Sequence, residues 1–252
     1  MPAVYRDMIG AKLVTIFPRN DTRGLHTHNA TIQLFEAETG EPLALIGGRV
    51  ITALRTAAVS ALATRELAGR DARVLAILGS GVQARTHYQA LRSVRNFAEV
   101  RVWSRTPEHA AQFAQEIEAR AMDAEQAVRG ADVVVTVTNS PDPVLRGAWL
   151  KEGAHVNAVG AVGPQRREID EEAMKNAIVV VESREAAERE SGDILQSGAA
   201  IYAELGELLA GTKPKPQGGR TVFKSLGVAV EDVAAAKLVY DKARSTASSA
   251  QL

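Results

Sequence analysis

The sequence predicts an α/β fold in which a Rossmann-type, doubly wound parallel sheet is joined to a smaller α+β domain. Three observations favour this fold. Short apolar runs alternate with helical segments after Gly69, a glycine-rich turn links the first of these runs to a helix, and the chain before residue 52 is rich in strands instead. We expect a nucleotide-binding domain over residues 56–221 and a substrate and dimerisation domain built from residues 1–55 and 222–252.

The smaller domain is predicted from short β-branched runs at residues 12–17 and 30–35 and a returning strand at 43–46, with a turn over 38–42. An alanine-rich helix then begins with Thr52 as its N-cap and ends at Gly69. Three or four strands and one helix provide little core. We therefore expect that an oligomer completes this domain or that its N-terminal part is missing from the chain.

The larger domain is predicted from the alternation that follows. Strands are expected at residues 73–78, 99–103, 133–137, 155–159 and 178–181, with helices over 82–95 and from 107 onward. A loop over residues 213–219 leads to a last helix at 228–243. Strands that are apolar along their whole length indicate a parallel sheet that is buried on both faces.

Composition excludes several classes of protein. The chain has 252 residues, with 30 Lys+Arg against 30 Asp+Glu, so its formal net charge is zero, which argues against binding to nucleic acid or to an acidic membrane. The absence of cysteine excludes thiol nucleophiles, disulfides and cysteine-type zinc sites. No apolar run approaches the roughly 20 residues that span a bilayer. We expect a cytoplasmic protein.

The turn after the first apolar strand of the larger domain predicts a dinucleotide site. Residues 79–84 read G-x-G-x-x-A, a permitted variant of the dinucleotide fingerprint. Gly79 allows the tight turn, Gly81 lets the backbone approach a pyrophosphate, and Ala84 lets the helix pack on the strand. The free N–H groups of the helix N-terminus then bind the phosphates. The alternative is a plain tight turn.

The end of the next strand predicts which nucleotide binds. An NAD site has Asp or Glu there for the ribose 2′-hydroxyl, whereas this chain has Ser104, Arg105 and Thr106. A guanidinium can bind a 2′-phosphate bidentately, and two hydroxyl groups can donate to it. We therefore expect NADPH, with NADH as the weaker alternative. Arg105 could instead be a solvated loop cation.

Two basic residues of the smaller domain are candidates for the chemistry. Lys12, Val14 and Ile16 share one strand face, and a lysine on a half-apolar face has a lowered pKa that suits proton transfer. The alternative is an edge-strand lysine that blocks aggregation. Arg55 lies in the first turn of the alanine-rich helix, over a packed surface, where a carboxylate or phosphate partner is plausible. The alternative is a snorkelling arginine.

Other candidates are weaker. His26 and His28 could share a strand face, but no third ligand follows with metal spacing, so we expect no metal site. Glu190 and Asp193 lie in a polar loop before a helix. Asp193 could cap that helix and Glu190 could be a solvated surface charge.

Several further stretches, in order along the chain, carry a resemblance to a known family. The sequence resembles the ornithine cyclodeaminase/mu-crystallin family from about Lys12 to Tyr240, in the stretches VITALRTAAVSALAT, ILGSGVQA, VRVWSRT, NAVGA, ESGDIL, YAELGELLAG and VFKSLGVAVEDVAAAKLVYD. It is most similar to the mu-crystallin branch. The resemblance implies a homodimer in which each subunit has a Rossmann domain and a domain built from both chain ends.

The resemblance also implies an activity. Members of the mu-crystallin branch reduce the C=N bond of cyclic ketimine carboxylates with NAD(P)H, as oxidoreductases of the ketimine reductase or thiomorpholine-carboxylate dehydrogenase type, and bind thyroid hormone. It implies an active-site lysine at Lys12 and a hormone-contacting glutamate at Glu190. In the reductase that we expect, Arg55 holds the substrate carboxylate. Cofactor contacts are implied at Thr27, His28, Arg55, Gly79, Ser80, Gly81, Val82, Gln83, Ser104, Arg105, Thr106, Thr138, Asn139, Val159 and Ser225.

Two departures from the family bear on this activity. The cyclodeaminase branch has an aspartate where this chain has Ala161, which cannot accept a proton, so simple reduction is favoured over cyclodeamination. Family members also extend further at the N-terminus, with a substrate-binding arginine and strands of the dimer domain. We expect an NADPH-dependent ketimine reductase. A non-catalytic, NADPH-regulated thyroid-hormone-binding protein is the alternative, and an amino-acid dehydrogenase that uses free ammonia is a third.

Overall fold

The computed structural model describes residues 1–246. Residues 247–252, which the sequence analysis assigned to the smaller domain, lie outside the described residues. Contacts divide the chain into two compact units, one formed by residues 1–55 and those from 227 onward, and the other by residues 56–226. The assignment of these stretches to a substrate domain and an NADP-binding domain remains a prediction.

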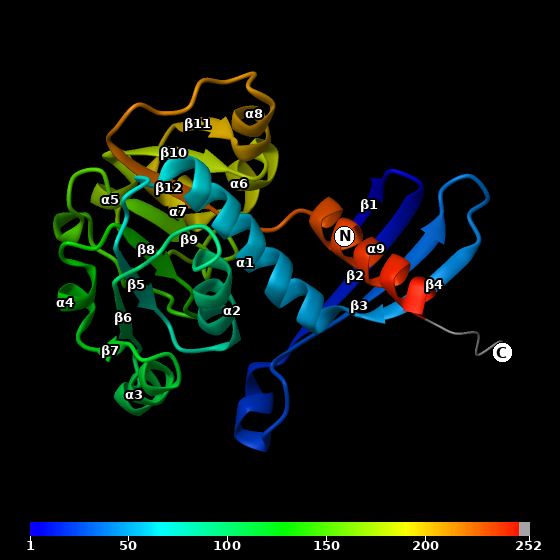
Figure 1. The fold of residues 1–252 in the computed structure, drawn as a ribbon, viewed down its shortest axis with the longest axis horizontal. Helices are drawn as coiled ribbons and strands as arrows, with labels where there is room; N and C mark the ends of the chain where they lie inside the picture. The colour runs from blue at the N-terminus through cyan, green and yellow to red at the C-terminus, as the bar shows by residue number, and fades with distance from the viewer. Residues whose placement is uncertain (247–252) are drawn as a thin grey trace. The chain divides into compact units, whose positions relative to one another are not determined.

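The smaller unit is a four-stranded antiparallel sheet with a helix on one face (Figure 1). The strands follow one another in the order β1-β2-β3-β4, and the long helix α1 comes directly after them. Its elements are β1 (Pro2–Tyr5), β2 (Met8–Ile16), the short 3₁₀ helix η1 (Pro18–Arg23), β3 (His28–Glu36), β4 (Pro42–Gly47), the start of α1 (Gly48–Leu67) and α9 (Ala229–Thr246).

The core of this unit lies between the sheet and α9. Alternate residues of β2 point to this side, and Met8 is buried there with Ile32 and Leu34 of β3. Val233 of α9 fills the space above Gly10, where an added Cβ would lie 2.7 Å from its Cγ2 atom. Glycine at position 10 therefore allows α9 to approach the strand closely.

The larger unit is built on an eight-stranded parallel sheet, which confirms the predicted fold class. Its strand order is β11-β10-β12-β9-β8-β5-β6-β7. The strands are β5 (Val74–Leu78), β6 (Glu99–Trp103), β7 (Arg120–Ala121), β8 (Val133–Thr136), β9 (His155–Ala158), β10 (Ala177–Val181), β11 (Ile201–Glu204) and β12 (Arg220–Lys224). From β5 the chain moves outward through β6 and β7, and then returns to β8 on the other side. The order therefore reverses between β5 and β8, where ligands bind in sheets of this type.

Helices cover both faces of this sheet, so its strands are apolar throughout. The connecting helices are α2 (Val82–Leu91), α3 (Pro107–Glu116), α4 (Ala124–Val128), η2 (Gly147–Trp149), α5 (Glu171–Lys175), α6 (Arg184–Glu190), α7 (Gly192–Ser197) and α8 (Leu205–Ala210). On one face, Leu75, Ile77 and Val135 pack against Leu91 of α2 and Phe113 of α3.

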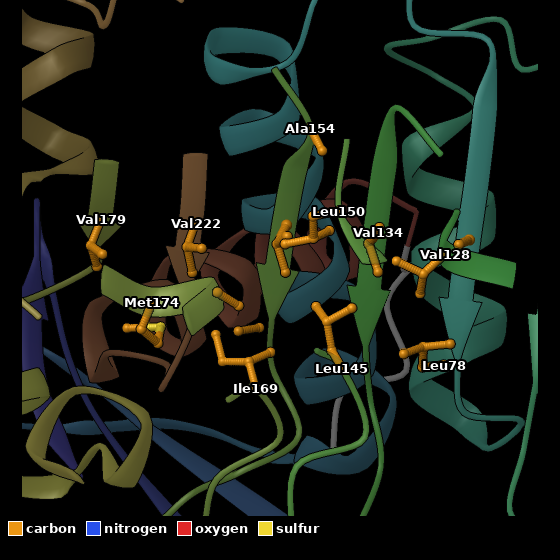
Figure 2. Packing of buried hydrophobic residues seen from close by; sticks show 14 of the residues in the cluster. Leu78, Val128, Val134, Leu145, Leu150, Ala154, Ile169, Met174, Val179 and Val222 are labelled. Atoms are coloured by element: carbon orange, nitrogen blue, oxygen red, sulfur yellow. The ribbon is translucent and has the colours of Figure 1, made fainter. Parts of the chain in front are cut away.

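On the other face, strand side chains pack against α4 and α5. Figure 2 shows Val134, Val179 and Val222 in this layer, with Val128 of α4 and Met174 of α5 over them. This double covering holds the carboxyl ends of the strands in a fixed order, which positions the loops that follow them. Among the helices of the described residues, none combines the length and the apolar character needed to cross a bilayer.

The structure corrects one helix boundary and adds elements that were not predicted. Helix α1 begins at Gly48, so Thr52 lies inside the helix and the predicted N-cap is wrong. The β-branched residues Val50 and Ile51 resemble the end of a strand, but Ile51 is buried in the core of the smaller unit as part of the helix. Strand β12 was not predicted, because it begins with Arg220 and ends with Lys224 and has only three less polar residues between them. It nevertheless pairs with both β9 and β10.

Candidate functional site

The glycine-rich turn has the geometry that a dinucleotide phosphate site needs. Gly79 has a φ of +136°, and a Cβ there would lie 2.6 Å from the Val137 backbone oxygen. A Cβ at Gly81, by contrast, would meet no atom within 4 Å, so the space above this residue is open. Gly81 is the N-cap of α2 and offers no side chain to the first N–H groups of that helix. These amides can therefore bind a phosphate.

The predicted 2′-phosphate residues lie at the carboxyl end of β6. The Ser80 hydroxyl donates to Ser104 Oγ at 2.9 Å, which ties the glycine-rich turn to this strand end. Arg105 is exposed, and Thr106 is the N-cap of α3 with no side-chain hydrogen bond to the helix. The exposed guanidinium and the adjoining hydroxyl group fit a nucleotide phosphate, a role that remains a prediction.

The other predicted cofactor residues of the larger unit follow neighbouring strands. Thr138 and Asn139 come after β8, Val159 after β9, and Ser225 after β12. Because these strands are parallel, the four residues lie with Gly79 along the edge of the sheet that is formed by the carboxyl ends of its strands. The structure thus gathers the residues predicted from this unit along one edge.

A buried carboxylate fixes two of these loops. Glu168 is fully buried, and its Oε1 accepts hydrogen bonds from the Thr138 N–H and hydroxyl groups, each at 2.6 Å. Its Oε2 accepts from the Gly160 N–H at 2.6 Å. Burial raises the pKa of Glu168. Glu168 was not predicted, since a single glutamate in the run R-R-E-I-D carries no signal of burial.

The residues predicted from the smaller unit surround a buried group of charges. The Lys12 side chain lies in an ion pair with Asp232 of α9, with 2.6 Å between Nζ and Oδ2. Arg55 donates from Nε to Asp232 Oδ1 at 3.0 Å and from Nη1 to Glu231 Oε2 at 2.9 Å. Lys12 is 3% exposed and Asp232 is 0% exposed. Two cations and two carboxylates are thus packed together; we call these four residues the charge cluster.

The geometry decides between the alternatives for Lys12 and Arg55. Strand β2 is paired on both sides, so Lys12 is not an edge-strand lysine. Arg55 has the carboxylate partners that the sequence allowed, and Gly227 lies against its guanidinium. A Cβ at Gly227, which has a φ of +81°, would lie 2.3 Å from Arg55 Nη1. The guanidinium is therefore held between carboxylates and a bare stretch of backbone.

Burial lowers the pKa of Lys12 and of the neighbouring His28. It lowers the pKa of Lys12, and the positive charge of Arg55 acts in the same direction, while Asp232 and Glu231 oppose it. The pKa of His28 is also lowered, by burial first and then by repulsion from Lys12 and Arg55. Thr27 precedes His28 at the start of β3 and is half-buried. A lysine whose pKa is lowered by burial suits proton transfer near neutral pH.

Asp232 and Glu231 were not predicted. They stand in the first turn of α9, where acidic residues commonly complement the helix dipole, so their positions alone gave no reason to expect a buried ion pair. Glu190 ends α6 and is exposed. Asp193 is not a helix cap: Ser191 caps α7, and Asp193 is buried inside that helix, beside Lys224.

The fold and the glycine-rich turn define a protein of the Rossmann dinucleotide-binding class. The chain belongs to the ornithine cyclodeaminase/mu-crystallin family, whose model matches residues 1–247. It is 50% identical over 246 residues to the ketimine reductase mu-crystallin of Rattus norvegicus, covering 96% of this chain and 79% of that protein.

Solved structures are similar over almost the whole chain. The Δ1-pyrroline-2-carboxylate reductase of Thermococcus litoralis, in complex with NADH and L-proline, is 38% identical with a TM-score of 0.89, covering 94% of this chain and 78% of that one. An archaeal alanine dehydrogenase dimer with bound NAD is 35% identical with a TM-score of 0.95, covering 100% of this chain and 82% of that one.

Proposed function

We propose that the protein is an NADPH-dependent reductase of the C=N bond of cyclic ketimine carboxylates. The observation that carries this proposal is the buried Lys12, which shares the carboxylate of Asp232 with Arg55. The chain is also 50% identical over 246 residues to a protein named ketimine reductase mu-crystallin. A pyrroline-2-carboxylate reductase among the similar structures supports the same substrate class. The alanine at position 161 supports reduction rather than cyclodeamination.

The larger unit is assigned to the cofactor. The amides that begin α2 bind the pyrophosphate, with Gly79, Ser80, Gly81, Val82 and Gln83 forming the turn around it. Thr138, Asn139, Val159 and Ser225 border the cofactor further along the sheet edge. A reduced nicotinamide nucleotide, when bound, supplies the hydride that the imine carbon accepts.

The smaller unit is assigned to the substrate. Arg55 binds the substrate carboxylate through its guanidinium, which can form two parallel hydrogen bonds. Lys12 donates a proton, directly or through water, and keeps the imine nitrogen protonated, because an iminium accepts hydride more readily than a neutral imine. Thr27 and His28 contribute contacts to the cofactor.

Arg105 is assigned to the 2′-phosphate of NADPH, together with Ser104 and Thr106. The similar structures carry NADH and NAD in their own sites. The preference for NADPH thus rests on the exposed guanidinium and on the absence of a carboxylate at the end of β6. NADH remains the weaker alternative.

The test is the loss of reduced-nicotinamide absorbance with Δ1-pyrroline-2-carboxylate, run in parallel with NADPH and NADH. We expect turnover with NADPH and slower turnover with NADH. Arg105→Ala should lower kcat/KM with NADPH by about ten- to hundredfold and leave the NADH reaction unchanged, because NADH has no 2′-phosphate. NADPH binding without turnover of cyclic ketimines would contradict the reductase and favour the alternative, an NADPH-regulated thyroid-hormone-binding protein in which Glu190 contacts the hormone.

We also propose that the protein is a homodimer. The sheet face of the smaller unit that points away from α9 carries Val4, Leu13 and Leu45, which are 63%, 73% and 71% exposed. An apolar face of this kind is typical of an association surface. Light scattering should give the mass of two chains for the protein and of one chain for Leu45→Lys, and a monomeric wild-type protein would contradict the proposal.

A further inference from the structure

We infer that Asp232 is a positioning residue, which holds the Lys12 ammonium and the Arg55 guanidinium on the two oxygens of one carboxylate. The inference rests on the proposed function in assigning chemistry to Lys12 and Arg55. Neither the composition nor the motifs of the sequence pointed to Asp232. Its assignment comes from the contacts of the charge cluster.

The carboxylate of Asp232 contacts both cations. Asp232 Oδ2 lies 2.6 Å from Lys12 Nζ, and Asp232 Oδ1 lies 3.0 Å from Arg55 Nε. The short side chain of Asp232 has only two rotatable bonds, so its carboxylate sets the separation of the Lys12 and Arg55 charges. Glu231 also contacts Arg55, but its side chain is 16% exposed, whereas that of Asp232 is 0% exposed. Among the four residues, Asp232 is the one that joins both cations.

The negative charge of Asp232 also stabilises the protonated form of Lys12. Two cations close together in a buried region repel each other, and burial alone favours the neutral form of a lysine. Asp232 is the strongest of the groups that stabilise the charged form of Lys12. Lys12 must carry a proton to donate it to an imine nitrogen. Asp232 thus keeps the donor charged next to a second positive group that binds the substrate carboxylate.

Other charged groups around Lys12 are few within the described residues. Besides burial, Arg55 of α1 lowers the pKa of Lys12 by repulsion, and Glu231 of α9 raises it by attraction. His28 of β3 is a titratable neighbour, and its own pKa is lowered by burial and by repulsion from Lys12. The amino group of Met1, which precedes β1, donates to the Lys12 backbone carbonyl and not to the side chain. Asp232 is thus the acidic group in direct contact with Nζ, and its removal should act on Lys12 first.

The test measures the titration of Lys12 directly, by the ¹³Cε chemical shift in protein labelled with ¹³C-lysine. The Lys12 resonance is assigned from its absence in Lys12→Arg. In Asp232→Asn, the pKa of Lys12 should fall by about one pH unit or more, since a neighbouring opposite charge shifts a pKa by about one to three. The matched control is Glu231→Gln, which removes the same charge one residue away and should move the pKa of Lys12 less. An unchanged Lys12 titration in Asp232→Asn, or an equal shift in both variants, would overturn the inference.

A kinetic readout links this titration to the reaction. The alkaline limb of kcat/KM against pH should move to lower pH in Asp232→Asn, in step with the Lys12 resonance, whereas a purely structural defect would lower the rate without moving the limb. If the alkaline limb of kcat/KM stays in place in Asp232→Asn while the titration of the Lys12 resonance moves, the assignment of Asp232 as the positioning residue for Lys12 in the reaction is overturned. If the wild-type protein has no reductase activity, the proposed function fails, but the resonance still reports whether Asp232 governs Lys12.

A second pair of variants covers the case in which Asp232→Asn does not fold because it leaves two cations against one carboxylate. Arg55→Gln with Asp232→Asn removes one cation together with the carboxylate and keeps the cluster neutral. The pKa of Lys12, measured from the same resonance, is compared between this double variant and Arg55→Gln alone. The pKa should again be lower without Asp232, and equal values in the two proteins would overturn the inference.

Discussion

Each unit of the protein buries a lysine–aspartate pair, and the two pairs differ in what else they contact. In the larger unit, Lys224 Nζ lies 3.0 Å from Asp193 Oδ2 and donates to the Ala161 carbonyl at 2.7 Å. Asp193 Oδ1 accepts from the N–H groups of Glu168 and Ile169 at 2.9 and 3.3 Å. In the smaller unit, the side chains of Lys12 and Asp232 contact other side chains, with Arg55 sharing the carboxylate.

The difference separates a structural ion pair from one that can take part in chemistry. The Lys224 pair joins the end of β12 and α7 to the segment after β9 through the backbone groups of Ala161, Glu168 and Ile169, which cannot leave without unfolding that segment. The charges of the Lys12 cluster are balanced by side chains, so this carboxylate holds two cations in place without fastening a loop. We therefore propose that the partners of a buried lysine, rather than its burial alone, distinguish a lysine that takes part in chemistry from a structural one.

The largest effect is expected from Lys12→Met. Catalytic proton donors contribute about 10²- to 10⁴-fold, so kcat/KM for a cyclic ketimine should fall by that factor. The fold should persist, because Asp232 keeps Arg55 as a counter-ion. Steady-state kinetics and thermal unfolding by circular dichroism measure the two effects. Full activity in this variant would remove the distinction between the two lysines.

Lys224→Met should lower the unfolding free energy and leave the pH dependence of the reaction unchanged. It leaves Asp193 buried without its cation, and breaking a buried ion pair in this way costs about 3–5 kcal/mol of unfolding free energy. Urea unfolding measures this loss. The protein that remains folded should keep the alkaline limb of its pH–rate profile in place, since Lys224 is not a proton donor. A limb that moves would show that the two lysines are not as different as their contacts indicate.

A smaller, pH-dependent effect is expected from two buried histidines of the larger unit. Burial lowers the pKa of His87 to about 4 and that of His155 to about 3, both below the 6.5 of an unfolded chain. The unfolded state therefore binds more protons below pH 6.5. The stability due to the neutral imidazoles is complete above that pH and falls by about 1.4 kcal/mol per pH unit for each histidine as the pH drops toward 4.

Urea midpoints between pH 7.5 and 5 test this dependence. His87→Gln should reduce the slope of unfolding free energy against pH, whatever its effect at pH 7.5. The exposed His109, replaced in the same way, is the matched control and should leave the slope unchanged. A slope that is the same in all three proteins would show that these imidazoles do not account for acid destabilisation.

The sequence was sufficient to predict the parallel sheet, because strands such as Val133–Thr136 are apolar on both faces and alternate with helices. It also indicated the sheet edge where Gly79 and Ser104 meet. It was not sufficient for the partners of Lys12, since Asp232 lies far along the chain and only the packing of α9 on β2 brings them together. For the same reason Glu168 was missed: its role depends on Thr138 and Gly160, which share no pattern with it.

The bare backbone at Gly227 has a consequence for the history of such chains. No side chain fits there while Arg55 keeps its place, because even a methyl group would overlap the guanidinium. Loss of the arginine alone would not free this position, because a φ of +81° still favours a residue without a side chain. A substituted residue at position 227 would therefore mark a chain in which the local backbone as well as the place of the guanidinium has changed.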